Sequence, residues 1–284
     1  MKLSLELNTA IELAHTAGKA ILEFYESDFA VEHKTTKDNF TEPVTIADKT
    51  ASRIIVEGLT AQFPGDGILS EEETDTSERL ERERLWLIDP LDGTKGFVQK
   101  NGDFAVQIGL AEDGEMILGV VFLPFFDQLY FATKGNGAFL VENAHPPRRL
   151  RVSDKTDFAQ MTIAVSRDHR SSKMSSIIEH FGIERETQRG SVGLKIGLLA
   201  TQACDLYIHL SPRTKHWDSA APEIIITEAG GNLTDLFGQQ IIYNTLDVQN
   251  YNGILATNGI SHQATVERLK PFLSGFGRLR VIGQ

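Results

Sequence analysis

The feature that most constrains this chain is the stretch Trp86–Phe97, which has the sequence WLIDPLDGTKGF. The apolar run Leu85–Ile88 at its start predicts a buried strand bounded by turn residues. Pro90 has no backbone N–H and cannot continue a hydrogen-bonded ladder, so we expect this strand to end at Asp89. A buried strand that stops at an acidic turn is therefore the first fixed point of the fold.

The turn itself carries the groups of an ion site. Asp89 and Asp92 lie on either side of it, and Gly93 and Thr94 begin the next element with unpaired backbone N–H groups, as helix starts do. Carboxylates suit hard cations and amides suit an anion, which together is what a site for Mg²⁺ and phosphate requires. Asp-Pro and Asp-Gly are also ordinary turn dipeptides, so this interpretation depends on the rest of the chain.

Length and charge limit the classes of protein to consider. The chain has 284 residues, enough for one large domain or two packed halves, and we place the boundary near residue 150. Residues 1–150 would then carry most of the candidate metal ligands and residues 151–284 the rest of the site. The net charge of −11 argues against a nucleic-acid binder, whereas a small phosphorylated substrate brought in with metal ions remains compatible.

The cellular compartment is indicated by features that the sequence lacks. The only cysteine, Cys204, excludes an internal disulfide, and its apolar surroundings place it in the core. The N-terminus has no signal segment, and no run approaches the ~18 apolar residues of a membrane span. We therefore expect a soluble cytoplasmic protein with neither nucleic-acid nor membrane partners, as a monomer or a homodimer.

Apolar spacing and turn residues outline the remaining elements. The first half is expected to contain a helix at residues 8–26, a polar loop at 32–40, a helix capped by Thr45, a strand at 68–70 and an antiparallel meander to about residue 132. The second half alternates strands at 161–165 and 206–210 with helices at 172–181, 192–204, 219–229 and 261–273. Residues 168–170 precede a helix and are either substrate contacts or a capped surface turn.

Three further carboxylates stand where an element meets a turn. Asp48 lies in the first turn of the helix capped by Thr45, Glu71 follows a short strand, and Asp218 begins a helix. Helix capping alone would explain Asp48 and Asp218, and Glu71 could belong to a solvated acidic patch. Their shared position favours a site, because layered α/β folds build sites at such junctions.

Four motifs in order give the chain a specific resemblance. They are Pro43–Asp48, Ser70–Glu72, Asp89–Thr94, and Trp217–Ala221 leading to Glu228–Gly231. In this order, over roughly residues 8–260, they resemble the inositol monophosphatase superfamily of Mg²⁺-dependent, lithium-sensitive phosphatases. The resemblance implies a fold of the α/β class, a layered α/β/α/β/α sandwich.

The resemblance also implies roles for individual positions, with two or three Mg²⁺ ions. Glu71, Asp89 and the Leu91 carbonyl match the ligands of the tightest metal, and Glu71 could hold a third cation through water. Asp89, Asp92 and Asp218 match the ligands of a second metal. The Gly93 and Thr94 amides match the phosphate cradle. The Thr94 hydroxyl, backed by Asp48 or Glu71, matches the group that orients the attacking water.

Other positions resemble one branch of the superfamily, the 3'(2'),5'-bisphosphate nucleotidases. Lys95-Gly96-Phe97 and the segment Gly190–Lys195 are similar to that branch, which implies that Lys95, Ser191 and Lys195 lie near substrate and that Ser191 and Lys195 lie near the second phosphate or the sugar. Lys195 could instead be an exposed helix residue. His209 stands near the position where inositol enzymes carry a sugar-binding glutamate.

The segment 211–216 is unusually basic. We predict that Arg213 or Lys215 contacts the non-scissile phosphate, although a local surface patch is equally compatible. The role of the basic run from Arg213 to His216 is otherwise open.

A phosphate monoester dianion repels hydroxide, and cations held by carboxylates offset that charge. No compelling nucleophile motif is present, so water is the economical attacking group. The resemblance thus predicts Mg²⁺-dependent hydrolysis of adenosine 3',5'-bisphosphate. The alternatives are hydrolysis of inositol 1-phosphate or of another sugar or histidinol phosphate, and a non-catalytic cation- or nucleotide-binding module.

Overall fold

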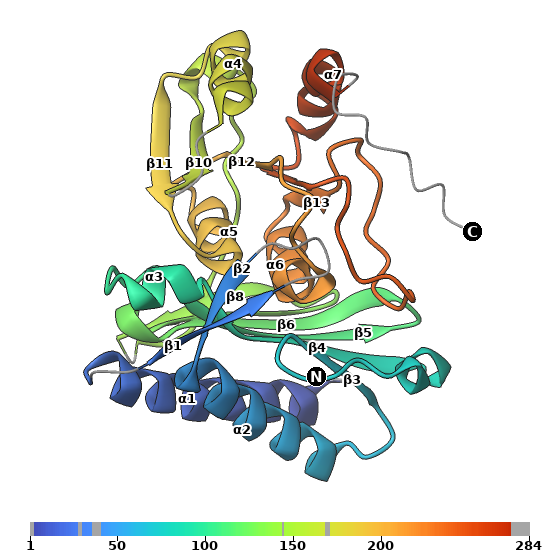
Figure 1. Ribbon diagram of the computed structural model, residues 1–284. Helices are drawn as coiled ribbons and strands as arrows, with labels where there is room; N and C mark the ends of the chain where they lie inside the picture. Colours follow the sequence, from blue (N-terminus) through green and yellow to red (C-terminus); the bar gives the residue numbers. More distant parts are fainter. Residues whose placement is uncertain (1–2, 28–29, 36–40, 144, 168–170, 274–284) are drawn as a thin grey trace.

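The computed structural model describes residues 3–27, 30–35, 41–143, 145–167 and 171–273, and residues 168–170 therefore lie outside it. Figure 1 shows five layers, which are, from bottom to top, a helix pair, a large sheet, a second helix pair, a smaller sheet and a third helix pair. The predicted α/β/α/β/α sandwich is thus confirmed.

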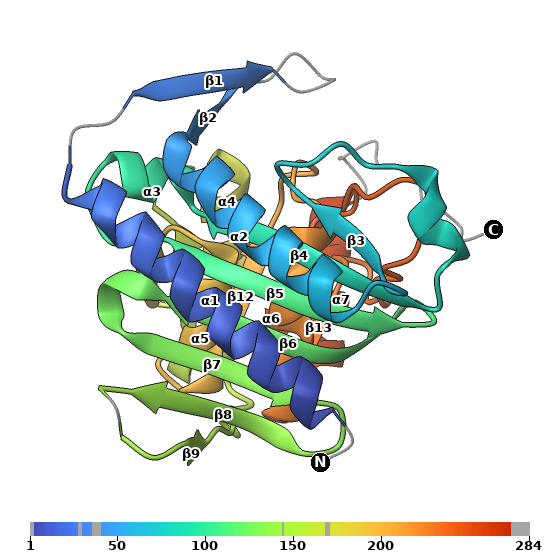
Figure 2. The same ribbon diagram turned by 90° about the horizontal axis from the view of Figure 1, so that it is seen from below.

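The large sheet and its outer helices come from the first half of the chain. Its seven strands, in spatial order, are β3 (Gly67–Ser70), β4 (Arg84–Asp92), β5 (Ala105–Glu112), β6 (Glu115–Leu123), β7 (Gln128–Thr133), β8 (Gly137–Glu142) and β9 (Arg148–Arg149). Strands β3 and β4 are parallel, and the pairs from β4 to β9 are antiparallel. Helices α1 (Ser4–Tyr25) and α2 (Ile46–Gln62) lie across one face, as Figure 2 shows from below.

Alternation along β5 explains why the sheet has helices on both faces. Val106, Ile108 and Leu110 are buried with α1 and α2, whereas Ala105 and Ala111 belong to the core on the other face. Helix α6 (His216–Glu228) packs on that second face. A Cβ atom on Gly119 of β6 would lie 2.6 Å from the Ala221 carbonyl oxygen, so glycine permits the close approach of α6.

The second half supplies the remaining layers. The smaller sheet has the order β11 (Arg185–Arg189), β10 (Thr162–Ser166), β12 (Leu206–His209), β14 (Ile254–Thr257) and β13 (Asn232–Thr234). Helix α5 (Val192–Ala200) accompanies α6 between the sheets, and α4 (Ser172–Phe181) and α7 (His262–Leu273) lie outside. The short helices are α3 (Thr94–Val98) and the 3₁₀ turns η1 (Ser77–Glu81), η2 (Pro124–Phe126) and η3 (Phe158–Gln160).

Two local predictions were wrong. The expected loop at residues 32–40 begins as strand β1 (Val31–Thr35), which pairs with β2 (Thr41–Thr45) in a separate antiparallel hairpin at the margin of the molecule (Figure 2). Strand β4 does not end at Asp89, because pairing with β5 resumes at Asp92 after an irregularity. The proline is tolerated because it falls where the ladder is interrupted.

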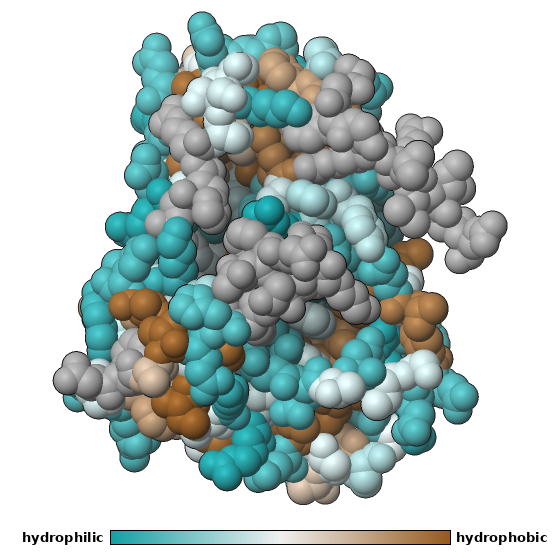
Figure 3. All heavy atoms as spheres, in the orientation of Figure 1, coloured by the Kyte–Doolittle hydropathy of each residue, from teal (hydrophilic) through white to brown (hydrophobic). Residues whose placement is uncertain are grey.

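Large apolar side chains on the surface are scattered. Leu246 is 75% exposed and Ile260 64% exposed, and Figure 3 shows a face on which apolar patches are separated by hydrophilic residues. Among the described residues, no helix is both long enough and apolar enough to cross a membrane. Cys204 is buried, as predicted.

Candidate active site

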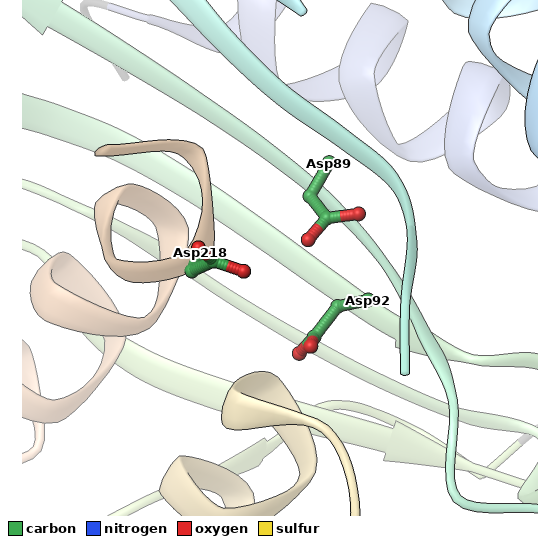
Figure 4. Close-up of side chains that lie close together, drawn as sticks. All are labelled: Asp89, Asp92 and Asp218. Atoms are coloured by element: carbon green, nitrogen blue, oxygen red, sulfur yellow. The ribbon is translucent and has the colours of Figure 1, made fainter. Parts of the chain in front are cut away.

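Three carboxylates from the two halves of the chain meet above the large sheet. Asp89 and Asp92 come from β4 and Asp218 from the first turn of α6, and one oxygen from each lies within 4.8 Å of the others. Figure 4 shows the three side chains directed toward a common space. Asp89 and Asp92 are buried, and Asp218 is half-buried. We call this group the aspartate cluster.

The irregularity in β4 sets the two aspartates of that strand. Asp89 is paired with Gln107 and Asp92 with Ala105, so the chain gains a residue on the β4 side between them. The Leu91 amide donates to Asp89 Oδ1 at 3.1 Å. Both carboxylates therefore point to the face of the sheet that α6 covers. Regular strand alternation would have placed Asp89 and Asp92 on opposite faces.

Asp218 has a structural role as well as its place in the cluster. One of its oxygens, Oδ2, accepts a 2.5 Å hydrogen bond from the Lys215 amide in front of α6. This contact satisfies an N–H group next to the helix start, as helix capping predicts. The capping interpretation and the site interpretation are thus compatible for this residue.

Glu71 lies beside Asp89 because of strand register. Strands β3 and β4 are parallel with Ser70 opposite Ile88, and the Glu71 amide donates to the Ile88 carbonyl oxygen at 3.1 Å. Glu71 lines the same cavity as the aspartate cluster, although it is not one of the three carboxylates within 4.8 Å. The structure thus brings Glu71 to the site without placing it in the tightest group.

Thr94 and Asp48 form a hydrogen-bonded pair next to the cluster. The Thr94 hydroxyl donates to Asp48 Oδ1 at 2.9 Å. The other oxygen of Asp48 accepts from the Thr45 amide at 2.7 Å and from the Thr45 hydroxyl at 2.6 Å. The Thr45 hydroxyl oxygen accepts from the Ala47 amide at 3.2 Å, so the predicted cap of α2 is present. Burial raises the pKa of Asp48, against the lowering effect of these hydrogen bonds.

Gly93 allows the turn before α3. Its φ of +95° lies in the left-handed region, and a Cβ atom there would be 2.4 Å from the Asp103 carbonyl oxygen. Helix α3 starts at Thr94, so the predicted helix start after the acidic turn is present. Gly93, Thr94 and Lys95 all line the cavity.

Asp92 is held by groups nearly a hundred residues away in the chain. Its Oδ2 accepts hydrogen bonds from the Ser191 hydroxyl at 2.6 Å and from the Gly193 amide at 2.9 Å. Burial raises the pKa of Asp92, while these hydrogen bonds and the charge of Lys195 act in the opposite direction. Sequence reasoning did not find these contacts.

Lys195 is buried rather than exposed, so the surface-residue alternative was wrong. Its ammonium group donates to the Gly190 carbonyl oxygen at 3.0 Å and lies 4.9 Å from the centre of the Tyr207 ring. Within the described part of the chain, neither Ser191 nor Lys195 lines the cavity beside the aspartate cluster. Ser191 contacts Asp92 through its hydroxyl, and Lys195 contacts Gly190 and the ring of Tyr207, which does line the cavity.

An open cavity of about 1580 Å³ extends from the aspartate cluster toward the smaller sheet. His209 and Arg213 line it, and Tyr207 Oη lies 3.1 Å from His209 Nδ1. Trp217 and Tyr251 add aromatic surface to its wall. The cavity thus combines acidic, basic and aromatic groups, as expected for a ligand larger than phosphate alone.

The run from Arg213 to His216 is less basic than its sequence indicates. His216 is buried, and burial lowers its pKa to about 4, so its ring is neutral at pH 7. Lys215 lines the cavity but also donates to Gln249 Oε1 at 2.8 Å.

Comparison with known proteins places the chain in a family. The model of the inositol monophosphatase family matches residues 2–271. The chain belongs to the inositol monophosphatase family. This family consists of metal-dependent phosphomonoesterases, and the resemblance predicted from the four motifs is confirmed.

Curated relatives in the family include bisphosphate nucleotidases. The 3'(2'),5'-bisphosphate nucleotidase CysQ of Salmonella typhimurium is 34% identical over 238 residues, which cover 84% of this chain and 93% of the relative. CysQ of Aggregatibacter actinomycetemcomitans is 37% identical over 242 residues, covering 84% of this chain and 87% of the relative.

Solved structures of the family share the fold. An IMPase of Thermotoga maritima has a TM-score of 0.80 and 28% identity, with 96% of this chain and 99% of that chain covered. CysQ of Bacteroides thetaiotaomicron, a member of the same family, has a TM-score of 0.74 and 29% identity, with 89% and 97% covered.

The aspartate cluster fits a divalent cation, as the family requires. Three carboxylates this close repel one another when ionised, and buried charges persist only when they are paired or coordinate a metal. Oxygen donors are the ligands that hard cations such as Mg²⁺ prefer. The donor set of this inositol monophosphatase family member thus agrees with the metal dependence of the family.

Proposed function

We propose that this chain is a Mg²⁺-dependent 3'(2'),5'-bisphosphate nucleotidase that hydrolyses adenosine 3',5'-bisphosphate to AMP and phosphate. The observation that carries the proposal is its identity of 34–37% with curated CysQ nucleotidases over 84% of the chain. The aspartate cluster and the large cavity beside it support the same activity.

Glu71, Asp89, the Leu91 carbonyl, Asp92 and Asp218 would hold two or three Mg²⁺ ions. All five residues line the cavity. Bound divalent cations supply positive charge that offsets the phosphate dianion and makes a neighbouring water more acidic. The carboxylates would hold the cations at one end of the cavity.

The Asp48–Thr94 pair would orient the attacking water. Because the Thr94 hydroxyl donates its proton to Asp48, its oxygen is left as an acceptor for a water O–H. Glu71 lines the cavity as the alternative group behind that water. The Gly93 and Thr94 amides and the Lys95 ammonium would hold the scissile phosphate at the start of α3.

The second phosphate and the sugar would lie farther along the cavity. His209 and Arg213 line this part, and Arg213 supplies the planar guanidinium that suits a phosphate group. Ser191 and Lys195 remain candidates for this role from the sequence, although Ser191 donates a hydrogen bond to Asp92 and Lys195 donates one to the Gly190 carbonyl oxygen.

The broader setting follows the sequence predictions. We propose a cytoplasmic enzyme, as a monomer or a homodimer, that acts on a small phosphorylated substrate and takes no nucleic-acid or membrane partner. Residues 1–150 and 151–284 would form its two halves, with Asp218 contributed by the second.

The test is phosphate release from a panel of substrates, with Mg²⁺ and with a chelator. Adenosine 3',5'-bisphosphate should be hydrolysed with the highest kcat/KM, and only with Mg²⁺. A preference of several hundredfold for inositol 1-phosphate would support an inositol monophosphatase instead. Release from none of the candidates, histidinol phosphate included, would favour a non-catalytic binding module.

A further inference from the structure

Asp103 is a buried carboxylate that sequence reasoning did not single out. It lies between α3 and β5 and is 1% exposed. Its Oδ2 accepts hydrogen bonds from the Gly190 amide at 2.7 Å and from Arg167 Nε at 2.8 Å, and Arg189 Nε lies 3.9 Å from Oδ1. A carboxylate of the first half thus neutralises positive charge at the carboxyl ends of β10 and β11 in the second half.

Gly190 is the first residue of the turn 190–193, which binds the Asp92 carboxylate. Ser191 has φ +43° and ψ 132°, a strained conformation for a residue with a side chain. Such a conformation persists only where the surroundings hold it. Asp103 accepts a hydrogen bond from the Gly190 amide, before Ser191 in the chain. Asp92 accepts hydrogen bonds from the Ser191 hydroxyl and from the Gly193 amide that follows it.

The main chain of Asp103 contacts the other side of the site. A Cβ atom on Gly93 would lie 2.4 Å from the Asp103 carbonyl oxygen, so the turn after Asp92 packs directly on this residue. The backbone of Asp103 therefore supports the chain that carries Asp92. Its side chain supports the turn that binds the Asp92 carboxylate.

We propose that Asp103 is a positioning residue of the metal site, which fixes the turn 190–193 and thereby the orientation of the Asp92 carboxylate. The inference rests on the proposed function, because it assumes that the aspartate cluster binds Mg²⁺. Groups that orient metal ligands commonly contribute about 10- to 100-fold to metal affinity. Asp103 acts through Asp92 and need not touch the substrate.

The test is the Mg²⁺ dissociation constant measured by calorimetry, together with the Mg²⁺ concentration for half-maximal phosphate release. Asp103→Asn keeps the size of the side chain but removes the charge facing Arg167 and Arg189. Both quantities should rise by about 10-fold or more, while the substrate KM at saturating Mg²⁺ changes little. Asp103→Glu, which restores the charge, should recover part of the affinity.

Asp205→Asn is the matched control. Asp205 is also a fully buried carboxylate that accepts from a backbone amide, that of Thr162 at 2.7 Å, and pairs with a cation, Lys155 at 2.8 Å. The residues that its carboxylate contacts, Ser153, Lys155 and Thr162, lie outside the turn 190–193. Its substitution should lower the unfolding temperature and leave the Mg²⁺ dissociation constant unchanged.

A second variant covers the case in which Asp103→Asn does not fold. A Cβ atom on Gly190 would lie 2.9 Å from the Asp103 Cβ, so Gly190→Ala should push the turn away and weaken Mg²⁺ binding without a change of charge. If Asp103→Asn or Gly190→Ala folds and binds Mg²⁺ with wild-type affinity, the inference is overturned but the proposed function is not. The same holds if Asp205→Asn loses as much Mg²⁺ affinity as Asp103→Asn. Absence of Mg²⁺ binding by the wild type would overturn the proposed function and the inference with it.

Discussion

Asp89 is a buried carboxylate that lies close to other negative charges. It is 1% exposed and lies within 4.8 Å of two other carboxylates. Its charge is therefore costly unless cations are bound beside it. The same charge that makes the site bind a cation destabilises the site without one.

Asp89→Asn should separate these two effects. We expect phosphate release to fall by more than about 100-fold, because losing a ligand costs more than losing a group behind one. In the presence of a chelator, the unfolding temperature should stay the same or rise, because like-charge repulsion is reduced. Mg²⁺-dependent activity near the wild-type level would remove Asp89 from the ligand set.

Glu223 makes the stability of the fold depend on pH. Burial raises its pKa to about 7, although its carboxylate accepts a 2.5 Å hydrogen bond from Tyr243. The folded state therefore binds a proton that the unfolded state loses at lower pH. Stability should decrease as pH rises from about 4.5 to 7.

The prediction is tested by urea unfolding of wild type and Glu223→Gln at pH 5 and pH 8, in chelator. Glutamine keeps an acceptor for Tyr243 and mimics the protonated acid. The two proteins should be similar at pH 5, and Glu223→Gln should be more stable at pH 8 by about 2 kcal/mol. The same difference at both pH values would mean that Glu223 does not titrate in this range.

At the scale of the element, the turn between β4 and α3 depends on glycine for two reasons. Gly93 has φ +95° and has no room for a Cβ atom because of the Asp103 carbonyl oxygen. Gly135 has a similar φ of +77° but has nothing within 4 Å of a Cβ position. The two glycines thus share the backbone strain and differ in the clash.

Gly93→Ala should lower the free energy of unfolding by at least about 2 kcal/mol and reduce phosphate release. Gly135→Ala should cost only about 1–2 kcal/mol, the strain of the left-handed conformation, with activity unchanged. Chemical unfolding and phosphate release of both variants provide the comparison. Equal losses of stability in the two variants would show that contact with Asp103 adds nothing.

Elements with a strong local signal were predictable from the sequence. Helix α4 was expected at residues 172–181 and runs from Ser172 to Phe181, because its apolar spacing and the Ser171 cap are local features. Strand β11, with the sequence RETQR, has no alternating pattern and was missed. It forms because it pairs with β10, which lies more than twenty residues earlier. Pairing of this kind leaves no local pattern.

The candidate site shows the same division. The acidic positions were found because each lies near the end of a strand, directly after one, or in the first turn of a helix, within a short motif. The contact of Ser191 with Asp92 joins residues 99 apart in the chain, and it depends on a positive φ that serine rarely adopts. Neither this contact nor the proposed positioning role of Asp103 could be predicted from the spacing of residues in the sequence.

At the scale of the whole molecule, the two halves share a hydrophobic core. The core on the inner face of the large sheet includes Leu87 and Val121 from the first half and Ala221 and Ile225 from the second. Helix α6, which carries Asp218, covers much of that face. The halves proposed at residue 150 are thus parts of one packed unit.

A fragment of residues 1–150 should therefore not fold alone. Without α6 and α5, the inner face of its sheet would expose a large apolar surface. We expect the fragment to bind a hydrophobic dye and to lack the near-ultraviolet circular dichroism of the full chain. A cooperative unfolding transition with a native-like spectrum would show that the first half is an independent domain.

The central claim is that carboxylates from both halves converge to hold the divalent cations on which phosphate release depends. An anomalous difference map from a crystal soaked in Mn²⁺ tests it most directly, because Mn²⁺ accepts the same oxygen ligands as Mg²⁺. The account predicts a peak bounded by Asp89, Asp92 and Asp218. Peaks found only elsewhere, with these three side chains unchanged and phosphate release supported by Mn²⁺, would contradict it.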